Sequence, residues 1–509
     1  MNHVDVRRGA YADSVTLMQV SRSVATSHGV DGAMVAMATP LNLDLLAGMG
    51  FEPPDASPND MVVAIRLGPD GELDEALSAV DAALAVARRT RAAGAVEAAP
   101  HRTTATALRD SDATLALVSV PGPYAFVEAM DALAASRDVM VFSDNMPLEQ
   151  EIRLKSEAAE RDLLVMGPDC GTAVVGGLGL GFANATRPGP VGVVAASGTG
   201  CQQLLCLLDS GGVGITAAFG VGGRDLSEPV GGVSTRQAMR RLDADPATEL
   251  IVVVSKPPAA TVATELVSYA GELSTPAEFV LLGAGEPDLT AGAERVLAAL
   301  DRPTPAWPRW GERAASTRVG YLRGLYCGGT LCDEAMLIAG QAGETGQAGQ
   351  AGQTGQAGQT GRQLGPVRSN IPLSPELALD GSLTAPAHLM IDFGDDALTA
   401  GRAHPMIDPT LRLERLAAEA ADPDTAVLLL DVVLGHGAHP DPAADLAPEV
   451  AATTTRGVPV VIALVGTAAD PQDLEGQATA LADAGAEVFA SNAEATRRAV
   501  ALVGTGGLR

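Results

Sequence analysis

Aromatic residues make up only 3% of this 509-residue chain, although apolar residues make up 47%. The cores must therefore be filled by small aliphatic side chains, which suits stacked α/β layers. Basic residues are also scarce, with 34 against 62 acidic residues and a net charge of -28. Because this charge would repel both nucleic acid phosphates and anionic membranes, we expect neither as a partner.

Long apolar runs and paired cysteines are missing too. Runs such as LIVVVS stop well short of the ~20 residues of a membrane span, and the first residues, MNHVDVRRGAYADS, lack the apolar core of a secretion signal. We therefore expect a cytoplasmic protein. The five cysteines lack the spacing of a zinc site, so we expect free thiols and no metal. They are Cys170, Cys201, Cys206, Cys327 and Cys332.

The chain is long enough for about three or four domains. Short β-branched runs alternate with helical stretches from His101 onward, which predicts an α/β protein with several doubly wound parallel sheets. The predicted parts are a small α+β module (1–100), a first sheet domain (101–188), a second (189–310), a glycine loop with its helix (311–339), a low-complexity segment (340–365) and a third sheet domain (366–509). The GQAG-like repeats lack large apolar residues, so we expect disorder there.

Two glycine-rich loops lead from a predicted strand directly into a helix. One carries Ser197, Gly198, Thr199 and Gly200, and the other carries Gly328, Gly329 and Thr330. Such loops direct free backbone N–H groups and the positive helix end toward one place, which favours phosphate or carboxylate binding. The alternative is a tight turn, but two loops of like design suggest two helix ends that meet one ligand. An added Cβ at either loop would crowd the anion, or strain the backbone if φ is positive.

Three distal histidines are candidate catalytic groups. His436 and His439 lie on a loop at the end of a predicted strand, where open α/β sheets bind ligands, and His404 precedes them. A general acid or phosphate donor could act there. Structural loop histidines and a metal site with Asp441 are the alternatives.

Five further side chains allow a functional and a structural interpretation. Asp431 and Asp169 could orient a base or cap a helix. Cys201 and Cys332 lie in the first turn of predicted helices, where the dipole lowers thiol pKa, but they could equally be small packing residues. Arg402 could clamp a carboxylate or pair with Asp408.

Ordered motifs carry a resemblance to a known family. The segments VSVPGP, FSDNMP, MGPDCGT, VGVVAASGTG and GVGGRDLSE follow one another as in the α subunit of succinyl-CoA synthetases, and the region from IDFGDDALTAGRAHPMIDP onward resembles the ligase domain of the β subunit. The residues of the motifs GPDCGT, GGTLCDEA and GHGAHPDPA narrow the resemblance to FdrA proteins.

The resemblance implies a fold and a function. It implies a Rossmann-like CoA-binding-type domain at 101–188 and two flavodoxin-like ligase domains, of α type at 189–310 and of β type at 366–509. A CoA-type site would then use Pro121, Gly122, Ser143, Asp144 and Asn145. FdrA proteins resemble a component of oxamate carbamoyltransferase, which with phosphate splits oxalurate into oxamate and carbamoyl phosphate. They have also been described as acyl-CoA synthetases.

Departures from the ligase pattern favour carbamoyl transfer. No histidine occurs between His101 and His388, so the phosphohistidine of the α-type domain is missing, and Lys256 follows the strand where the ligases place an acidic residue. Lys256 and Arg224 would suit a small anionic substrate, with phosphate or carbamoyl phosphate as co-substrate. CoA remains an open cofactor. Partner subunits or a homo-oligomer are expected, and a non-catalytic regulatory scaffold remains the third alternative.

Overall fold

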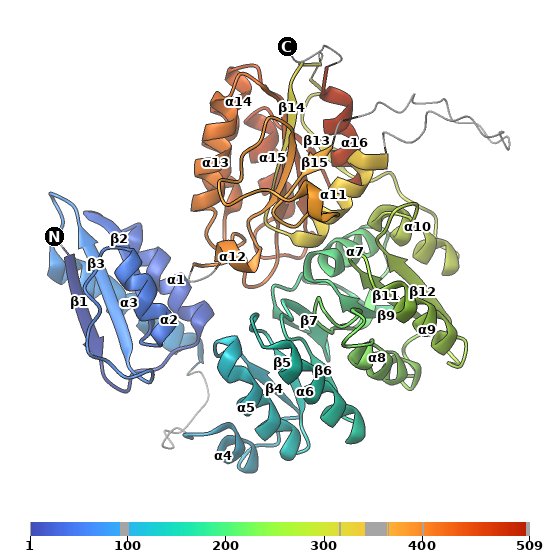
Figure 1. The fold of residues 1–509 in the computed structure, drawn as a ribbon, viewed down its shortest axis with the longest axis horizontal. Helices are drawn as coiled ribbons and strands as arrows, with labels where there is room; N and C mark the ends of the chain where they lie inside the picture. The colour runs from blue at the N-terminus through green and yellow to red at the C-terminus, as the bar shows by residue number, and fades with distance from the viewer. Residues whose placement is uncertain are drawn as a thin grey trace. The chain divides into compact units, whose positions relative to one another are not determined.

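The computed structural model describes residues 2–91, 101–314, 317–341, 364, 366–399 and 402–504. These residues form two compact units, one of residues 1–111 with 399–403 and one of 112–398 with 404–509. Figure 1 shows the elements of both. The predicted low-complexity segment lies almost wholly outside the described residues.

The first unit is a three-stranded antiparallel sheet of order β1-β3-β2 with helices on both faces. Alternate residues of the central strand β3 point to opposite faces: Met61, Val63 and Ile65 contact the core under α1 and α3, whereas Val62 and Ala64 contact the core near α2. The bounds are β1 (Asn2–Arg7), α1 (Ser14–Ala25), β2 (Val30–Met37), α2 (Pro40–Gly48), β3 (Met61–Leu67), α3 (Leu73–Arg91) and α4 (Thr104–Arg109).

The second unit begins with a parallel three-stranded sheet of order β4-β5-β6. Its elements are β4 (Leu115–Val118), α5 (Gly122–Ala134), β5 (Asp138–Val141), α6 (Leu148–Glu160) and β6 (Val165–Met166). The next two strands, β7 (Thr172–Val175) and β8 (Leu178–Gly181), form a hairpin that pairs antiparallel with β10 of the following sheet. Residues 172–181 therefore belong to the second sheet, although the sequence places them in the first sheet domain.

The second sheet has the order β12-β11-β9-β10-β7-β8, and β9 to β12 are parallel. In Figure 1 α8 and α9 cover one face, and α7 and α10 cover the other. The bounds are β9 (Pro188–Ala196), α7 (Gly198–Ser210), β10 (Ile215–Gly220), α8 (Val233–Asp243), β11 (Leu250–Ser255), α9 (Ala260–Ala270), β12 (Ala277–Leu281) and α10 (Leu289–Ala299).

The third sheet has the order β13-β19-β18-β17-β14-β16-β15 and is parallel except for β13. Strand β14 lies between β17 and β16, so the second glycine loop belongs to this domain. The bounds are β13 (Arg309–Trp310), β14 (Tyr321–Tyr326), α11 (Gly329–Gln341), β15 (Val367–Arg368), η1 (Pro375–Leu377), β16 (His388–Asp392), α12 (Asp396–Thr399), α13 (Thr410–Ala421), β17 (Thr425–Val433), α14 (Pro442–Thr455), β18 (Val460–Val465), α15 (Leu474–Asp483), β19 (Glu487–Phe489) and α16 (Asn492–Leu502).

Buried polar contacts join the second and third sheet domains. Asn184 Nδ2 donates to Asp470 Oδ2 (2.7 Å) and to the Leu434 carbonyl (3.0 Å). Asn492 N donates to Gln203 Oε1 at 3.0 Å. Because an unpaired buried polar group costs free energy, these bonds favour one arrangement of the two domains. Among the described helices, none is both long and apolar enough to span a bilayer.

Candidate functional site

The first glycine loop connects β9 to α7. Ser197 is the N-cap of α7, and its Oγ accepts the N–H of Gly200 at 3.0 Å. The first N–H groups of a helix have no partner within that helix. Since Ser197 takes the N–H of Gly200, those of Gly198 and Thr199 are left for a ligand at the positive end of the helix.

The second glycine loop connects β14 to α11, and a buried ion pair fixes its start. Cys327 N donates to Asp431 Oδ1 at 2.7 Å, and Asp431 also pairs with Arg412 at 3.0 Å. Asp431 therefore caps no helix. Its Oδ2 has no hydrogen-bond partner among the described residues, so orientation of a base by Asp431 stays a prediction. Asp431 holds the backbone at the point where the loop leaves the strand.

The two loops touch each other. Ser197 Oγ and Thr330 Oγ1 are 2.7 Å apart and hydrogen-bonded. A Cβ on Gly328 would lie 2.6 Å from the Thr199 side chain. The juxtaposition of the loops expected from the sequence is therefore present, and the amino ends of α7 and α11 lie together. Neither Gly198 nor Gly329 has a positive φ, so backbone strain does not require glycine at either position. A Cβ would be crowded at Gly329, 2.8 Å from Asp392 Oδ2, but not at Gly198, where the nearest atom is 4.0 Å away.

Carboxyl groups with raised pKa values surround two cations beside the loops. Burial raises the pKa of Asp169 to about 7 although Lys256 opposes the shift, and it raises the pKa of Asp333, in α11, to about 6 against the same lysine. Lys256 is exposed and has no ion pair within the described residues. Arg224 contacts Glu151 at 2.9 Å and the Met146 carbonyl at 2.7 Å. Asp169 caps no helix.

Asp392 lies against the second loop, and it is not among the residues expected from the sequence. A Cβ on Gly329 would lie 2.8 Å from Asp392 Oδ2. Burial raises the pKa of Asp392 to about 8, and nearby Asp431, Asp395 and Asp333 raise it further, although the Gly394 N–H opposes the shift. Its place at the last position of a buried parallel strand is the signal that could have identified it.

The loops of the predicted CoA-type site lie together. A Cβ on Gly122, at the start of α5, would lie 1.9 Å from the Asp144 carbonyl oxygen. Ser143 Oγ donates to the Val120 carbonyl, Pro121 is the N-cap of α5, and Asn145 has a φ of 57°. The adjacent Phe142 ring lies 5.7 Å from Phe182, which in turn lies 5.4 Å from the His404 ring.

The three candidate histidines have different surroundings. His404 contacts Phe182, and burial lowers its pKa to about 4, with Arg412 acting in the same direction. Its Nδ1 accepts the Met406 N–H at 3.2 Å, so the neutral ring carries its proton on Nε2. A Cβ on Gly394 would lie 2.8 Å from that Nε2. His404 thus lies near Asp392.

His436 and His439 make other contacts than His404 does. His436 is exposed, and its N–H donates to the Ala183 carbonyl at 2.8 Å. His439 Nε2 lies 3.4 Å from Asp445, and its Nδ1 accepts the Asp441 N–H at 2.9 Å. That bond makes His439 and Asp441 parts of one turn at the start of α14. The described residues contain no group of three His, Cys, Asp or Glu side chains that could hold a metal.

Arg402 is exposed. Asp408 Oδ1 accepts the Thr410 N–H at 3.0 Å. Carboxylate binding by Arg402 and its pairing with Asp408 both stay predictions.

All five cysteines are buried. Burial raises the pKa of Cys201 to about 12 and raises that of Cys332 well above its ordinary value, so desolvation outweighs the helix dipole. Both are packing residues. We expect a thiol reagent such as Ellman's reagent to label none of the five in the native protein at pH 7 and all five in denaturant. Rapid labelling of the native protein would contradict this assignment.

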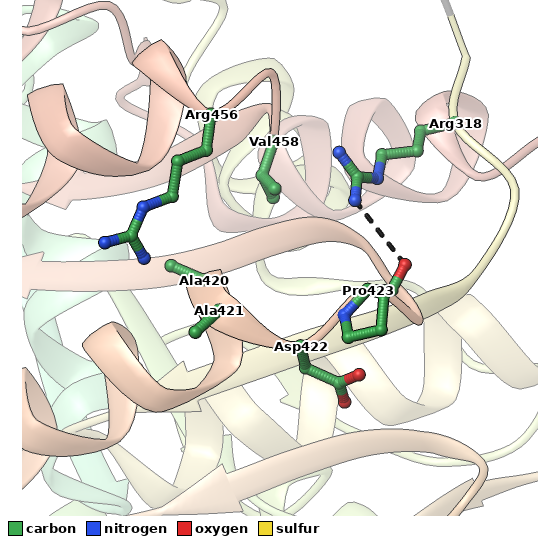
Figure 2. Close-up of a pocket in the computed structure, with 7 residues that line it drawn as sticks. All are labelled: Arg318, Ala420, Ala421, Asp422, Pro423, Arg456 and Val458. Carbon is green, nitrogen blue, oxygen red and sulfur yellow. Dashed lines mark hydrogen bonds between the residues drawn. The ribbon is translucent and has the colours of Figure 1, made fainter.

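A separate cavity lies at the amino ends of strands β14, β17 and β18 of the third sheet. Its volume is about 390 Å³, and Arg318 and Arg456 face it from two sides in Figure 2. Helices α13 and α14 end there at Asp422 and Arg456, and helix carboxyl ends carry partial negative charge. The arginines compensate that charge, so we do not assign the cavity as an anion site.

Comparisons with known proteins define the family. A family model described as CoA-ligase matches residues 325–502, and one described as AllF, heavy metal-associated domain, matches residues 1–100. The uncharacterized protein YahF of Escherichia coli strain K12 is 35% identical over 517 residues and covers 96% of each chain. This chain belongs to the YahF family.

The YahF family lies in the succinyl-CoA synthetase superfamily. Succinate–CoA ligase subunit alpha 2 of Archaeoglobus fulgidus is 28% identical over 154 residues, which cover 30% of this chain and about half (52%) of that subunit. ATP citrate lyase from Methanothrix soehngenii, solved with citrate and coenzyme A, is 21% identical over 35% of this chain and 30% of its own, with a TM-score of 0.32. Acetyl-coenzyme A synthetase 1 of Ca. Korarchaeum cryptofilum is 14% identical over 80% of this chain and 86% of its own, with a TM-score of 0.28.

The name of the amino-terminal family model implies a heavy metal, but the residues present do not fit one. Residues 1–100 contain no cysteine, and their histidines are His3 and His28. Soft metals prefer thiolate ligands. We therefore assign no metal to this module.

Proposed function

We propose that this chain is a phosphate-dependent carbamoyl or acyl transferase of the FdrA type, with an oxamate carbamoyltransferase-like reaction. The observation that carries the proposal is the contact between the glycine loops through Ser197 and Thr330, in a chain with no histidine between His101 and His388. Two helix ends can stabilise a developing oxyanion and a phosphate, and transfer through an acyl phosphate needs no phosphoenzyme.

His404 does not replace the missing phosphohistidine in this arrangement. A histidine attacks phosphorus through an unprotonated ring nitrogen, whereas the Nδ1 lone pair of His404 is occupied by Met406 N and Nε2 carries the proton. The ring can donate a hydrogen bond to an anion.

The proposed roles of the other residues follow from their positions. Lys256 and Arg224 would hold the anionic substrate beside the loops, and Arg402 remains a proposed carboxylate-binding residue. His436 and His439 remain proposed acid or base residues of the neighbouring turn. Phosphate or carbamoyl phosphate is the proposed co-substrate. Cytoplasmic location and partner subunits are part of the same proposal.

An acyl-CoA synthetase is the second candidate. The contact of Gly122 with Asp144 and the match of residues 325–502 to the CoA-ligase model favour it. In that case Pro121, Ser143 and Asn145 would line the CoA site.

Phosphate-dependent cleavage of oxalurate tests the first candidate. The purified chain, alone and with the products of neighbouring genes, is expected to release oxamate and carbamoyl phosphate. Matched reactions with succinate, CoA and ATP test the second. Thioester formation without oxalurate cleavage would contradict carbamoyl transfer.

Incubation with labelled ATP gives an independent prediction. We expect no stoichiometric acid-labile phosphate on the protein, because the α-type domain has no histidine to modify. One equivalent of acid-labile phosphate per chain would contradict this prediction and support the acyl-CoA synthetase mechanism. Mapping it to His404 would overturn the tautomer argument as well.

A further inference from the structure

Asp392 is clamped in place at the end of β16. Its N–H donates to Asn370 Oδ1 at 2.9 Å, and its carbonyl oxygen accepts from Asn370 Nδ2 at 2.8 Å. Its Oδ1 accepts the Gly394 N–H at 2.8 Å. One side chain and one backbone amide therefore fix both the position and the rotation of the carboxyl group.

The other carboxyl oxygen faces the second glycine loop. Asp392 is 5% exposed, and its Oδ2 has no hydrogen-bond partner among the residues that the structure describes. That oxygen lies against the first residue of α11, because a Cβ on Gly329 would come within 2.8 Å of it. A nine-tenths buried carboxyl group with one unpartnered oxygen at a helix end indicates a ligand contact.

Carbamoyl transfer to phosphate needs a group that transfers protons beside the reacting atoms. The leaving group is an amide nitrogen, which is a poor leaving group unless an acid protonates it as the carbon–nitrogen bond breaks. The attacking hydrogen phosphate carries one proton that the product, carbamoyl phosphate, lacks. One group that gives a proton to nitrogen and takes one from phosphate balances the reaction.

We propose that Asp392 is this proton relay, and the proposal rests on the carbamoyl transfer proposed above. A phosphate oxygen forms the bond to the carbamoyl carbon while the carbon–nitrogen bond breaks. The Asp392 carboxyl gives its proton to the leaving nitrogen and receives the phosphate proton. No oxidant or reductant is required, and the carboxyl group ends as it began.

The electrostatics of the site support a neutral Asp392. Burial raises its pKa to about 8, and the carboxyl groups of Asp431, Asp395 and Asp333 act in the same direction. The buried Cys327 and Cys332 thiols and the neutral His404 ring supply no positive charge nearby. A buried carboxylic acid that stays protonated at neutral pH can donate a hydrogen bond to an oxyanion.

The test compares Asp392→Asn with wild type on two carbamoyl donors. Oxalurate has a basic leaving nitrogen, whereas 4-nitrophenyl carbamate has a leaving group that needs no acid. We expect Asp392→Asn to lose about 10²–10⁴-fold in kcat on oxalurate and less than about tenfold on the activated donor. Equal losses on both donors would mean a structural role and overturn the relay. The control Asp483→Asn changes an exposed carboxylate at the end of α15 and should match wild type.

Stability against pH gives a readout that does not need activity. A carboxyl group whose pKa rises on folding destabilises the folded state as pH rises from its unfolded pKa to its folded pKa. The urea midpoint of Asp392→Asn should therefore rise relative to that of wild type as pH increases from 5 to 8, and it should lie above that of wild type at pH 8. A variant that is less stable than wild type at pH 8 would show that the carboxylate is charged, which excludes the relay.

The two proposals fail in different ways. If wild type cleaves neither donor but the stability pattern holds, carbamoyl transfer fails while the protonated carboxyl stands. If wild type cleaves oxalurate and the Asp392→Asn losses are equal, only the relay fails.

Discussion

Gly328→Ala is expected to separate the two glycine loops and to weaken phosphate binding by at least about tenfold. The added Cβ would lie 2.6 Å from two atoms of Thr199, so α11 must move away from α7. Overpacking of this kind costs about 1–3 kcal/mol of stability. Urea denaturation measures the stability, and titration calorimetry with inorganic phosphate measures the affinity.

Gly198→Val is the matched variant. The nearest atom to a Cβ at Gly198 is Thr172 Oγ1 at 4.0 Å, and the residue has no positive φ, so the substitution should leave the free energy of unfolding nearly unchanged. Because the side chain would enter the space in front of the α7 amide groups, phosphate affinity should still fall. Wild-type affinity in both variants would mean that the loops are only turns.

The general architecture follows from the sequence because its signals are local. Buried β-branched runs alternate with helical stretches, and this alternation predicts parallel sheets. The β7–β8 hairpin was not predicted in its sheet, since TAVV and LGLG are short, LGLG contains two glycines, and β10, the partner of β7, is distant in sequence. Nothing in residues 172–181 alone indicates pairing with Ala218.

The site is less predictable than the fold. Glycine loops have a recognisable pattern, so their meeting could be expected. The spacing of His404, His436 and His439 could not show which ring lies near the loops, because that depends on Phe182, from another sheet domain. Asp392 was missed because a single aspartate at the end of a buried strand forms no recognisable motif. Its candidate role depends on its contacts with Gly329 and Asn370, which are visible only in the structure.

A buried charge cluster joins the first and second sheet domains of the second unit. Lys155 Nζ, on α6, donates to Glu151 Oε1 (2.8 Å), Asp225 Oδ1 (2.7 Å) and the Val221 carbonyl (2.9 Å). Lys155 is 1% exposed, and both carboxylates are fully buried. Glu151 also contacts Arg224 at 2.9 Å, so the cluster positions one of the proposed substrate-binding cations.

Lys155→Met should therefore be among the most damaging single substitutions. It preserves much of the side-chain volume but leaves two buried carboxylates without their shared cation, which costs about 3–5 kcal/mol for a broken buried pair. Arg187→Met is the control, because Arg187 pairs with Asp209 at 2.8 Å with its own side chain 53% exposed, and exposed pairs contribute about 0–1 kcal/mol. Urea denaturation at pH 7 gives both values. Adding Glu151→Gln to Lys155→Met removes one of the two buried carboxylates and should recover part of the loss. Equal effects of Lys155→Met and Arg187→Met would show that the cluster is hydrated and does not hold the two domains together.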